Sequence, residues 1–316
     1  MITNSKIAWG DQLGAQMSAF AELYYIAREN NQDICFFKEF KNCRRRYLIL
    51  ENFDIEMQIK LLRRLYLPIP EIYCLQFRPG RKAKSIENYK RIYKSKIHWK
   101  IDSYYYRFCK LFYKDFINIS GKNGLNCDTK LLDLNNKKNY DIQDGFGTYQ
   151  DWKKYEDDII NLFKFKSEII NQGNAIFNEL DIEKLLVSIH FRRGDYLILA
   201  SLNLGLDYYK KALSFFNKDK YELVIFSDDI EYCKSVEIFK DYKVHYMDSH
   251  SAAIDMYLMS LCNSNIIANS SFSFWGAMLN NNKDKKVICP HDFIGTSDKE
   301  NNYINGNYYP EKWSAI

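Results

Sequence analysis

Residues 188–198, SIHFRRGDYLI, are the stretch of this sequence best suited to chemistry, because His190, Arg192, Arg193 and Asp195 gather at the end of an apolar run. Charged side chains are rarely buried without a partner, so a strand that only fills a core does not need them. The planar guanidinium group offers a fork of donors that matches phosphate oxygens. The stretch therefore predicts an anion site, and an internal network of ion pairs is the alternative interpretation.

The two arginines are neighbours in the sequence, which limits how a strand can present them. Successive side chains of a strand point to opposite faces, so Arg192 and Arg193 reach one ligand only if the turn at Gly194 has already begun. Otherwise one of the two is structural. Asp195 is a candidate to orient an arginine, and His190 is a candidate hydrogen-bonding wall or proton acceptor.

Two more polar clusters follow apolar runs. In IFSDD, the carboxylates of Asp228 and Asp229 could hold a divalent metal, cap the next helix or accept hydrogen bonds from a purine. In ANSSFSFWGAML, hydroxyl and N–H groups gather at a helix N-terminus, which is either an anion site or an ordinary N-cap. The serines of interest in this run are Ser270, Ser271 and Ser273.

Alternating strands and helices would position these clusters. From residue 185 the pattern predicts strands at 185–191, 221–229, 243–247, 265–270 and 285–290, separated by helices at 207–216, 230–239, 252–262 and 271–279. Asp207 is the expected N-cap of the first of these helices. Such alternation predicts a parallel sheet with helices on both faces, and ligands bind beyond the carboxyl ends of its strands. We therefore expect the three clusters to meet at one edge.

The first half of the chain begins in a similar way, with a short strand, the turn GDQLGAQ and a helix that has an apolar stripe. The turn contains Gly14 and Gln16 but matches neither the dinucleotide-binding fingerprint nor the P-loop. Residues 38–180 are mostly helical in pattern. Because 316 residues more often form two domains than one, we expect an α/β protein with lobes at 1–182 and 183–316 and a cleft between them.

The charge of the chain is unevenly distributed. Residues 41–114 contain 19 Lys and Arg against 6 Asp and Glu, a net charge of +13, which leaves −8 for the rest of a chain whose total is +5. Aromatic side chains lie among these cations. The segment is suited to an anionic membrane surface or to nucleic acid, and a solvated helical face explains it equally well.

Neither the N-terminal sequence nor the cysteines indicate export. The N-terminal sequence MITNSKIAWGDQ lacks a basic stretch followed by an apolar run, and no stretch approaches the roughly 18 apolar residues of a spanning helix. The eight cysteines form no C-x-x-C pair and no zinc-binding spacing. We expect a cytoplasmic protein with reduced, buried thiols, able to lie at the inner face of the cytoplasmic membrane.

Taken together, these motifs resemble the α-1,2-fucosyltransferases of glycosyltransferase family 11, in particular the bacterial members. The resemblance rests on GDQLGAQMSAFA, GFGTYQDWKKYEDDI, HFRRGDY, FSDD, NSSFSFWGAML and YYPEKW, in this order along most of the chain. Residues 38–140 are the least alike. The opening motif of that family usually has asparagine where Ala15 stands here, so a role of that asparagine does not carry over, whereas Gln16 remains.

The resemblance implies a GT-B-like fold of two Rossmann-like domains that binds GDP-fucose in the second domain and a galactoside in the cleft. It implies an inverting transfer of L-fucose to the 2-hydroxyl of a terminal β-galactose, in surface-glycan or O-antigen synthesis, without metal or other cofactor. Arg192 would hold the diphosphate with Arg193 in support. His190 and Asp228 would lie near the guanosine. The remaining donor-site residues would be Gly14, Gln16, Ser270, Ser271 and Ser273.

The catalytic base stays open, with His190 and Asp195 as candidates beside a substrate or phosphate oxygen. The nearest alternative function is a GT-B enzyme that uses another GDP-sugar or another acceptor hydroxyl, because a fold and a phosphate clamp define neither. Further alternatives are a nucleic-acid-binding protein that uses residues 41–114 and a GDP-sugar sensor without catalysis.

Overall fold

A computed structural model describes residues 1–4, 7, 12–38, 47–55, 60–63, 116–119, 134–135, 137–142, 147–197, 203–248, 250–293 and 306–316. The chain divides into two compact units. The first comprises 1–12, 16–51 and 55–147, and the second 13–15, 52–54 and 148–316. The chain passes from the first unit to the second for the last time at 147–148, whereas the predicted boundary is at 182–183. Helices α6 (Tyr149–Trp152), α7 (Glu156–Leu162) and α8 (Ser167–Asn178) belong to the second unit, where α8 packs on α11 (Ala252–Leu261).

The first unit contains two small parallel sheets. The first has the order β1 (Ile2–Thr3), β5 (Asn139–Ile142), β4 (Phe116–Ile119), and the second pairs β2 (Cys35–Lys38) with β3 (Lys60–Arg63). Helix α1 (Leu13–Glu29) is largely buried, and the short α2 (Leu48–Asn52) follows β2. Strands β3, β4 and β5 lie in the region whose sequence pattern is mostly helical. The pattern did not predict them because strands of four residues are too short to show a period of two.

The second unit is built on one parallel sheet of six strands. Their order is β11 (Ser314–Ala315), β10 (Val287–Cys289), β9 (Ser264–Ile266), β6 (Leu185–Phe191), β7 (Tyr221–Ser227), β8 (Val244–Met247). All five pairings are parallel, as predicted from the alternating pattern. The chain runs from β6 outward through β7 and β8, then returns to the other side of β6 and runs outward through β9 and β10.

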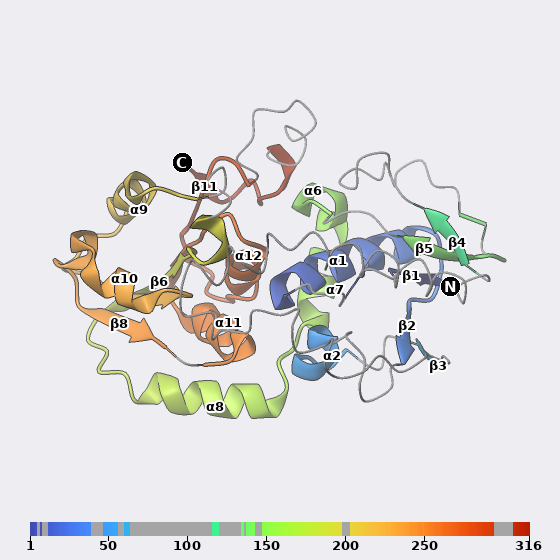
Figure 1. Ribbon diagram of the computed structural model, residues 1–316, viewed down its shortest axis with the longest axis horizontal. Coiled ribbons are helices and arrows are strands. Elements are labelled where there is room, and N and C mark those ends of the chain that lie inside the picture. The colour runs from blue at the N-terminus through green and yellow to red at the C-terminus, as the bar shows by residue number, and fades with distance from the viewer. Residues whose placement is uncertain are drawn as a thin grey trace, which may run out of the picture. The chain divides into compact units, whose positions relative to one another are not determined.

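Helices cover both faces of this sheet (Figure 1). Alternate residues of β6, Val187, Ile189 and Phe191, join a buried cluster with α9 (Leu206–Leu213) and α10 (Ile230–Ser235). The opposite face of the sheet packs against α11 and α8, with Phe272 of α12 (Ser271–Met278) beside them. The period of two along β6 therefore decides which helix layer each side chain meets.

The structure corrects several boundaries of this unit. Gly205, not Asp207, is the N-cap of α9, and Asp207 lies in the first turn. The helix expected at 230–239 ends at Ser235, because Val236 is extended, and a 3-10 turn at Glu237–Phe239 follows. Strand β11 was not predicted, because two residues carry no periodic signal.

A buried amide pair fixes the pairing of β9 with β6. The Asn265 side-chain amide donates to the Ser188 hydroxyl at 2.6 Å and to the Met259 carbonyl at 3.0 Å. The Asn280 amide donates to the Asn265 side-chain oxygen at 2.9 Å and to the Cys262 carbonyl at 2.7 Å. Only the bond to Ser188 crosses to β6, and because a buried polar group without a partner costs roughly 1–3 kcal/mol, it favours this one register of the two strands.

Aromatic packing anchors α12. Trp275 is fully buried and stacks on Trp152, with ring centroids 5.4 Å apart and an interplanar angle of 12°. Phe163 meets the Trp275 ring edge-on at 5.0 Å. The neighbouring Phe274 contacts Tyr308, Tyr309 and Trp313 of the last described segment.

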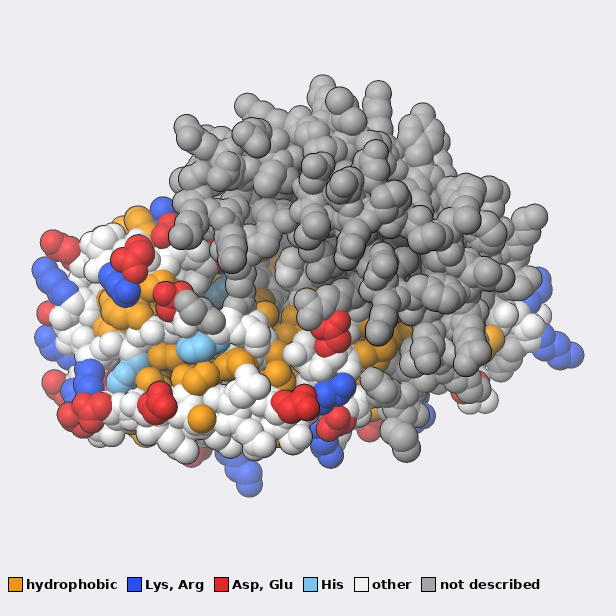
Figure 2. Space-filling view, turned by 60° about the horizontal axis from the view of Figure 1, so that its bottom comes forward, with side chains coloured by type: hydrophobic (Ala, Val, Ile, Leu, Met, Phe, Trp, Pro, Cys, Tyr) orange, Lys and Arg blue, Asp and Glu red, His pale blue; other side chains and the backbone are white. Residues whose placement is uncertain are grey.

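Surface charge in the described part of the chain is mixed. On the face in Figure 2, acidic and basic side chains lie interspersed among apolar ones. The basic segment 41–114 falls largely outside the described residues, so its contact with a membrane or nucleic acid stays a prediction. Among the described helices, none has both the length and the apolar character needed to cross a bilayer. The described cysteines, Cys35, Cys233, Cys262 and Cys289, are buried thiols outside any disulfide, as expected.

Replacement of Trp275 by alanine should lower the free energy of unfolding by about 3–5 kcal/mol, because it removes a buried ring and leaves a cavity. Urea denaturation followed by far-UV circular dichroism measures the change. The control is Phe215→Ala, because that ring is 41% exposed and its loss should cost about 1 kcal/mol or less. Equal losses in the two variants would contradict the buried stack.

Candidate active site

The three polar clusters meet at the carboxyl ends of β6, β7 and β9, as the sequence predicted. An ion pair of 3.0 Å joins Arg192 Nη1, after β6, to Asp228 Oδ2, after β7. On the other side of β6, the Tyr196 hydroxyl donates to the Asn269 carbonyl, in the loop after β9, at 3.0 Å. This edge is where the strand order reverses, and α/β sheets bind ligands at such points.

Strand alternation separates the two arginines. Arg193 turns to the α10 side, where its Nε donates to Asp229 Oδ2 at 3.0 Å and its guanidinium carbon lies 3.3 Å from the centre of the Tyr232 ring. Arg192 instead lies over the Tyr196 ring at 5.4 Å, and its side chain is 27% exposed against 17% for Arg193. The geometry thus favours the case in which Arg193 is structural and Arg192 remains accessible.

Asp228 and Asp229 both belong to this network of ion pairs. Besides its bond to Arg192, Asp228 accepts the backbone N–H of Arg193 at 2.9 Å. Asp229 is the N-cap of α10 and accepts the N–H of Tyr232 at 3.3 Å. Helix capping, one of the three roles considered for this pair, is therefore observed for Asp229.

A hydroxyl links the ends of the two strands beneath these carboxylates. Ser227 Oγ donates to the carbonyl of the last residue of β6 at 2.6 Å and accepts the N–H of Asp229 at 3.0 Å. A side chain at Gly194 would displace the Asp228 carboxylate, so glycine leaves room for this close approach. The turn after β6 and the carboxylates after β7 are thus built as one unit.

His190 points to the face of the sheet opposite to Arg193. Its ring is 5% exposed and lies with its centroid 5.3 Å from that of Phe272 in α12. Among the described residues, its Nδ1 has no hydrogen-bond partner. Burial, and to a lesser extent the charge of Arg192, lowers the pKa of His190 to about 3, so its imidazole is neutral near pH 7.

The serines at the start of α12 take different positions. Ser270 is the N-cap residue, and Ser271 opens the helix and is partly exposed. Ser273 is 1% exposed, and its hydroxyl accepts the N–H of Ala268 at 3.2 Å. The Ser273 hydroxyl therefore holds the loop, while Ser270 and Ser271 lie at the helix N-terminus, where backbone N–H groups favour anions.

The remaining predicted residues are placed less fully. Gly14 belongs to the second unit, and a Cβ there would overlap the backbone of Ser271 and Phe272, so only glycine fits. Gln16 belongs to the first unit and is fully buried. Asp195 begins a 3-10 turn, Asp195–Leu197, and its side chain lies outside the described residues. The roles predicted for Gln16 and Asp195 stay predictions.

Two tyrosines of this site carried no predicted role. Tyr196 lies under Arg192 and Tyr232 under Arg193. An aromatic residue next to an apolar run is typical of a core position, so the sequence alone does not show that its ring makes a cation–π contact. The only signal was the place of Tyr196 directly after the arginine motif.

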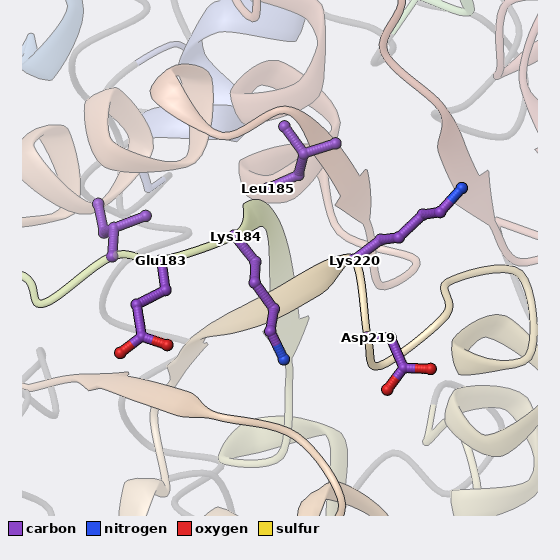
Figure 3. Close-up of a pocket in the computed structure, with 6 residues that line it drawn as sticks. Glu183, Lys184, Leu185, Asp219 and Lys220 are labelled. Carbon is purple, nitrogen blue, oxygen red and sulfur yellow. The ribbon is translucent and has the colours of Figure 1, made fainter.

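A shallow hollow of the second unit lies elsewhere (Figure 3). It lies at the amino ends of β6 and β7. Its lining residues are Ile182, Glu183, Lys184, Leu185, Asp219 and Lys220. Lysines and carboxylates alternate around it, and Lys184 donates to the Lys218 carbonyl at 3.0 Å. Because ligands of parallel sheets bind at the carboxyl ends, this hollow is not the candidate site.

The fold is that of a GT-B-like α/β protein with parallel sheets, as predicted, while the cleft between the units stays a prediction. The solved structure of a family 9 glycosyl transferase from Veillonella parvula is similar in fold, with a TM-score of 0.53 and 11% identity over all of this chain and 86% of that chain. The family model described as "Glycosyl transferase family 11" matches residues 28–313, and the chain belongs to this family.

Two curated relatives from Escherichia coli match part of the chain. The O-antigen biosynthesis glycosyltransferase WbnK is 34% identical over 163 residues, 46% of this chain and 52% of that protein. An alpha-1,2-colitosyltransferase is 38% identical over 141 residues, 41% of this chain and 47% of that protein. The match spans about half the length of these relatives, so their activities enter only as proposals for this chain.

The buried His190 should make the stability of the protein fall in weak acid. Because folding lowers the pKa of His190 from 6.5 to about 3, the unfolded chain binds a proton between these values and the folded chain does not. The free energy of unfolding should therefore decrease as the pH falls below 6.5, by about 1 to 2 kcal/mol at pH 5 through this residue. His190→Gln should not show this decrease.

Urea denaturation of both proteins at pH 6.5 and pH 5 measures the two losses. Other groups that titrate in this range contribute equally to both, so the difference between the losses reports His190 alone. Equal losses would place the His190 ring in water, against the burial described above.

Proposed function

We propose that this chain transfers L-fucose from GDP-L-fucose to the 2-hydroxyl of a terminal β-galactoside, with inversion, in the synthesis of a surface glycan such as O-antigen. One observation carries the proposal. The partly exposed Arg192 lies at the point where the strand order reverses, and Tyr196 joins it to Asn269, just before the N-cap of α12, in a chain of glycosyl transferase family 11. A guanidinium group and a helix N-terminus joined in this way are suited to a diphosphate.

The chemistry of the transfer explains why such a site is needed. The bond between the sugar C1 and the diphosphate oxygen breaks, and its electron pair leaves with GDP. The acceptor oxygen forms the new bond at C1 and loses its proton. Donors already aimed at the leaving oxygens stabilise the developing charge, and one such donor contributes about 3 kcal/mol. In this scheme Arg192 supplies that stabilisation, and Arg193 supports the turn that presents it.

A different role is proposed for His190. A side chain whose pKa is about 3 is a weak base near pH 7, so it is poorly suited to take the acceptor proton. Its buried, neutral ring is suited instead to a single hydrogen bond with the donor nucleotide. Asp195 remains the predicted protein base, beside an oxygen of the substrate itself.

A second donor is favoured by one observation. The relative that is 38% identical is named an alpha-1,2-colitosyltransferase, and colitose is L-fucose without its 3-hydroxyl group. A site that hydrogen-bonds this hydroxyl rejects the 3-deoxy sugar strongly, whereas an apolar site discriminates only weakly. The same enzyme scheme therefore holds for either sugar, and a comparison of the two donors decides between them.

The deciding experiment is GDP release by the purified protein in EDTA, with GDP-L-fucose or its 3-deoxy analogue as donor, with and without a terminal β-galactoside. Release of GDP from the fucosyl donor that depends on the galactoside supports the proposal. Faster release from the 3-deoxy donor would make the colitosyl sugar the substrate. GDP binding without release would indicate a sensor, and salt-sensitive binding of RNA without any binding of GDP would favour the nucleic-acid alternative.

The conservative change Arg192→Lys should lower the rate of transfer on the order of 100-fold, because a point ammonium cannot replace a bidentate fork. The control is Arg28→Lys, at an exposed position near the end of α1, which should keep the wild-type rate. Steady-state GDP release at saturating galactoside measures both variants. A rate near wild type for Arg192→Lys would remove Arg192 from the phosphate site.

A further inference from the structure

Tyr196 connects two parts of the candidate site that are far apart in the sequence. Its ring lies under the guanidinium group of Arg192, 5.4 Å from ring centre to guanidinium carbon. Its hydroxyl donates to the carbonyl of Asn269, 73 residues further along the chain, at 3.0 Å. Asn269 immediately precedes Ser270, the N-cap of α12. One side chain thus contacts the arginine after β6 and the loop that leads into α12.

Backbone pairing does not connect the two segments that Tyr196 joins. Strands β6 and β9 are neighbours in the sheet, but their pairing ends at Ile189↔Ile266, before the turn after β6 and the loop after β9. A cation–π contact and a hydrogen bond to a carbonyl are each directional. Together they fix where the Arg192 guanidinium group stands relative to the start of α12.

A second observation indicates that a ligand meets the start of α12. His190 is only 5% exposed, and its ring lies beside Phe272 in the first turn of α12. Its Nδ1 has no hydrogen-bond partner among the described residues. Buried polar atoms are nearly always hydrogen-bonded, so an unpaired one next to a helix N-terminus indicates a group that binds there.

From this geometry we propose that Tyr196 is a positioning residue that holds Arg192 and the N-terminus of α12 at the spacing of one diphosphate. This inference rests on the proposed function, because it concerns the diphosphate of the same donor. Arg192 contacts one phosphate and the first N–H groups of α12 contact the other. A monophosphate needs only one of the two partners, so its binding does not depend on their spacing.

The binding of GDP and GMP tests the inference, with the ratio of their dissociation constants as readout. Tyr196→Phe keeps the ring under Arg192 and removes the bond to Asn269. In this variant the preference for GDP over GMP should shrink about 3- to 10-fold, the range expected for one neutral hydrogen bond. Tyr196→Leu also removes the ring and should shrink the preference further.

Tyr208→Phe is the matched control. The Tyr208 hydroxyl donates to the Ile267 carbonyl at 2.6 Å, two residues before Asn269, but Tyr208 lies on α9, in the other helix layer. Removing this hydroxyl breaks the same kind of bond to the same loop. The variant should lose stability, as judged by thermal unfolding, and should keep the wild-type preference for GDP.

Isothermal titration calorimetry of the four proteins with GDP and GMP gives the ratios. A reduced preference in both Tyr196 variants, together with an unchanged one in Tyr208→Phe, supports the inference. Equal weakening of GDP and GMP in Tyr196→Phe, or the same change of ratio in Tyr208→Phe, overturns it. If the wild-type protein binds GDP no better than GMP, the inferred diphosphate site is absent. If it binds neither nucleotide, the proposed function itself fails.

Discussion

The reversal of strand order beside β6 is the constraint on which the rest of the second unit depends. Because β7 and β9 flank the same strand, the loops after both of them end next to the turn after β6. A guanidinium group, a pair of carboxylates and a helix N-terminus come together although they are separated by tens of residues in the sequence. The site is therefore a product of topology first and of residue type second.

Burial then gives neighbouring residues different chemistry. Arg193 and its partners Asp229 and Tyr232 belong to the α10 side of the sheet, whereas His190 faces α12. Arg192 is paired with Asp228 but still partly exposed. A paired, partly exposed arginine keeps its charge solvated without ligand and stays accessible to an anion, since an ion pair in contact with water contributes little to stability.

Much of this arrangement could be predicted from the sequence. The long buried strands β6 and β7 and the meeting of the three clusters followed from apolar runs that end in polar residues. The role of Tyr196 could not be predicted, because it depends on a carbonyl 73 residues away and an aromatic residue in that position is typical of a core. Short features such as β11 and the break at Val236 were not predicted either, because they span too few residues to show a period.

The amide pair of Asn265 and Asn280 has a consequence for how this fold can change. It is centred on Asn265, the middle residue of β9, and it ties that strand to Ser188 on β6. A shift of β9 by one residue would carry α12 roughly 3.3 Å along the sheet, away from the turn after β6. The buried amides thus help to set the position of β9, and with it the start of α12, relative to β6. Side chains around the anion site can vary without moving it, whereas its location depends on two asparagines that are buried inside the fold.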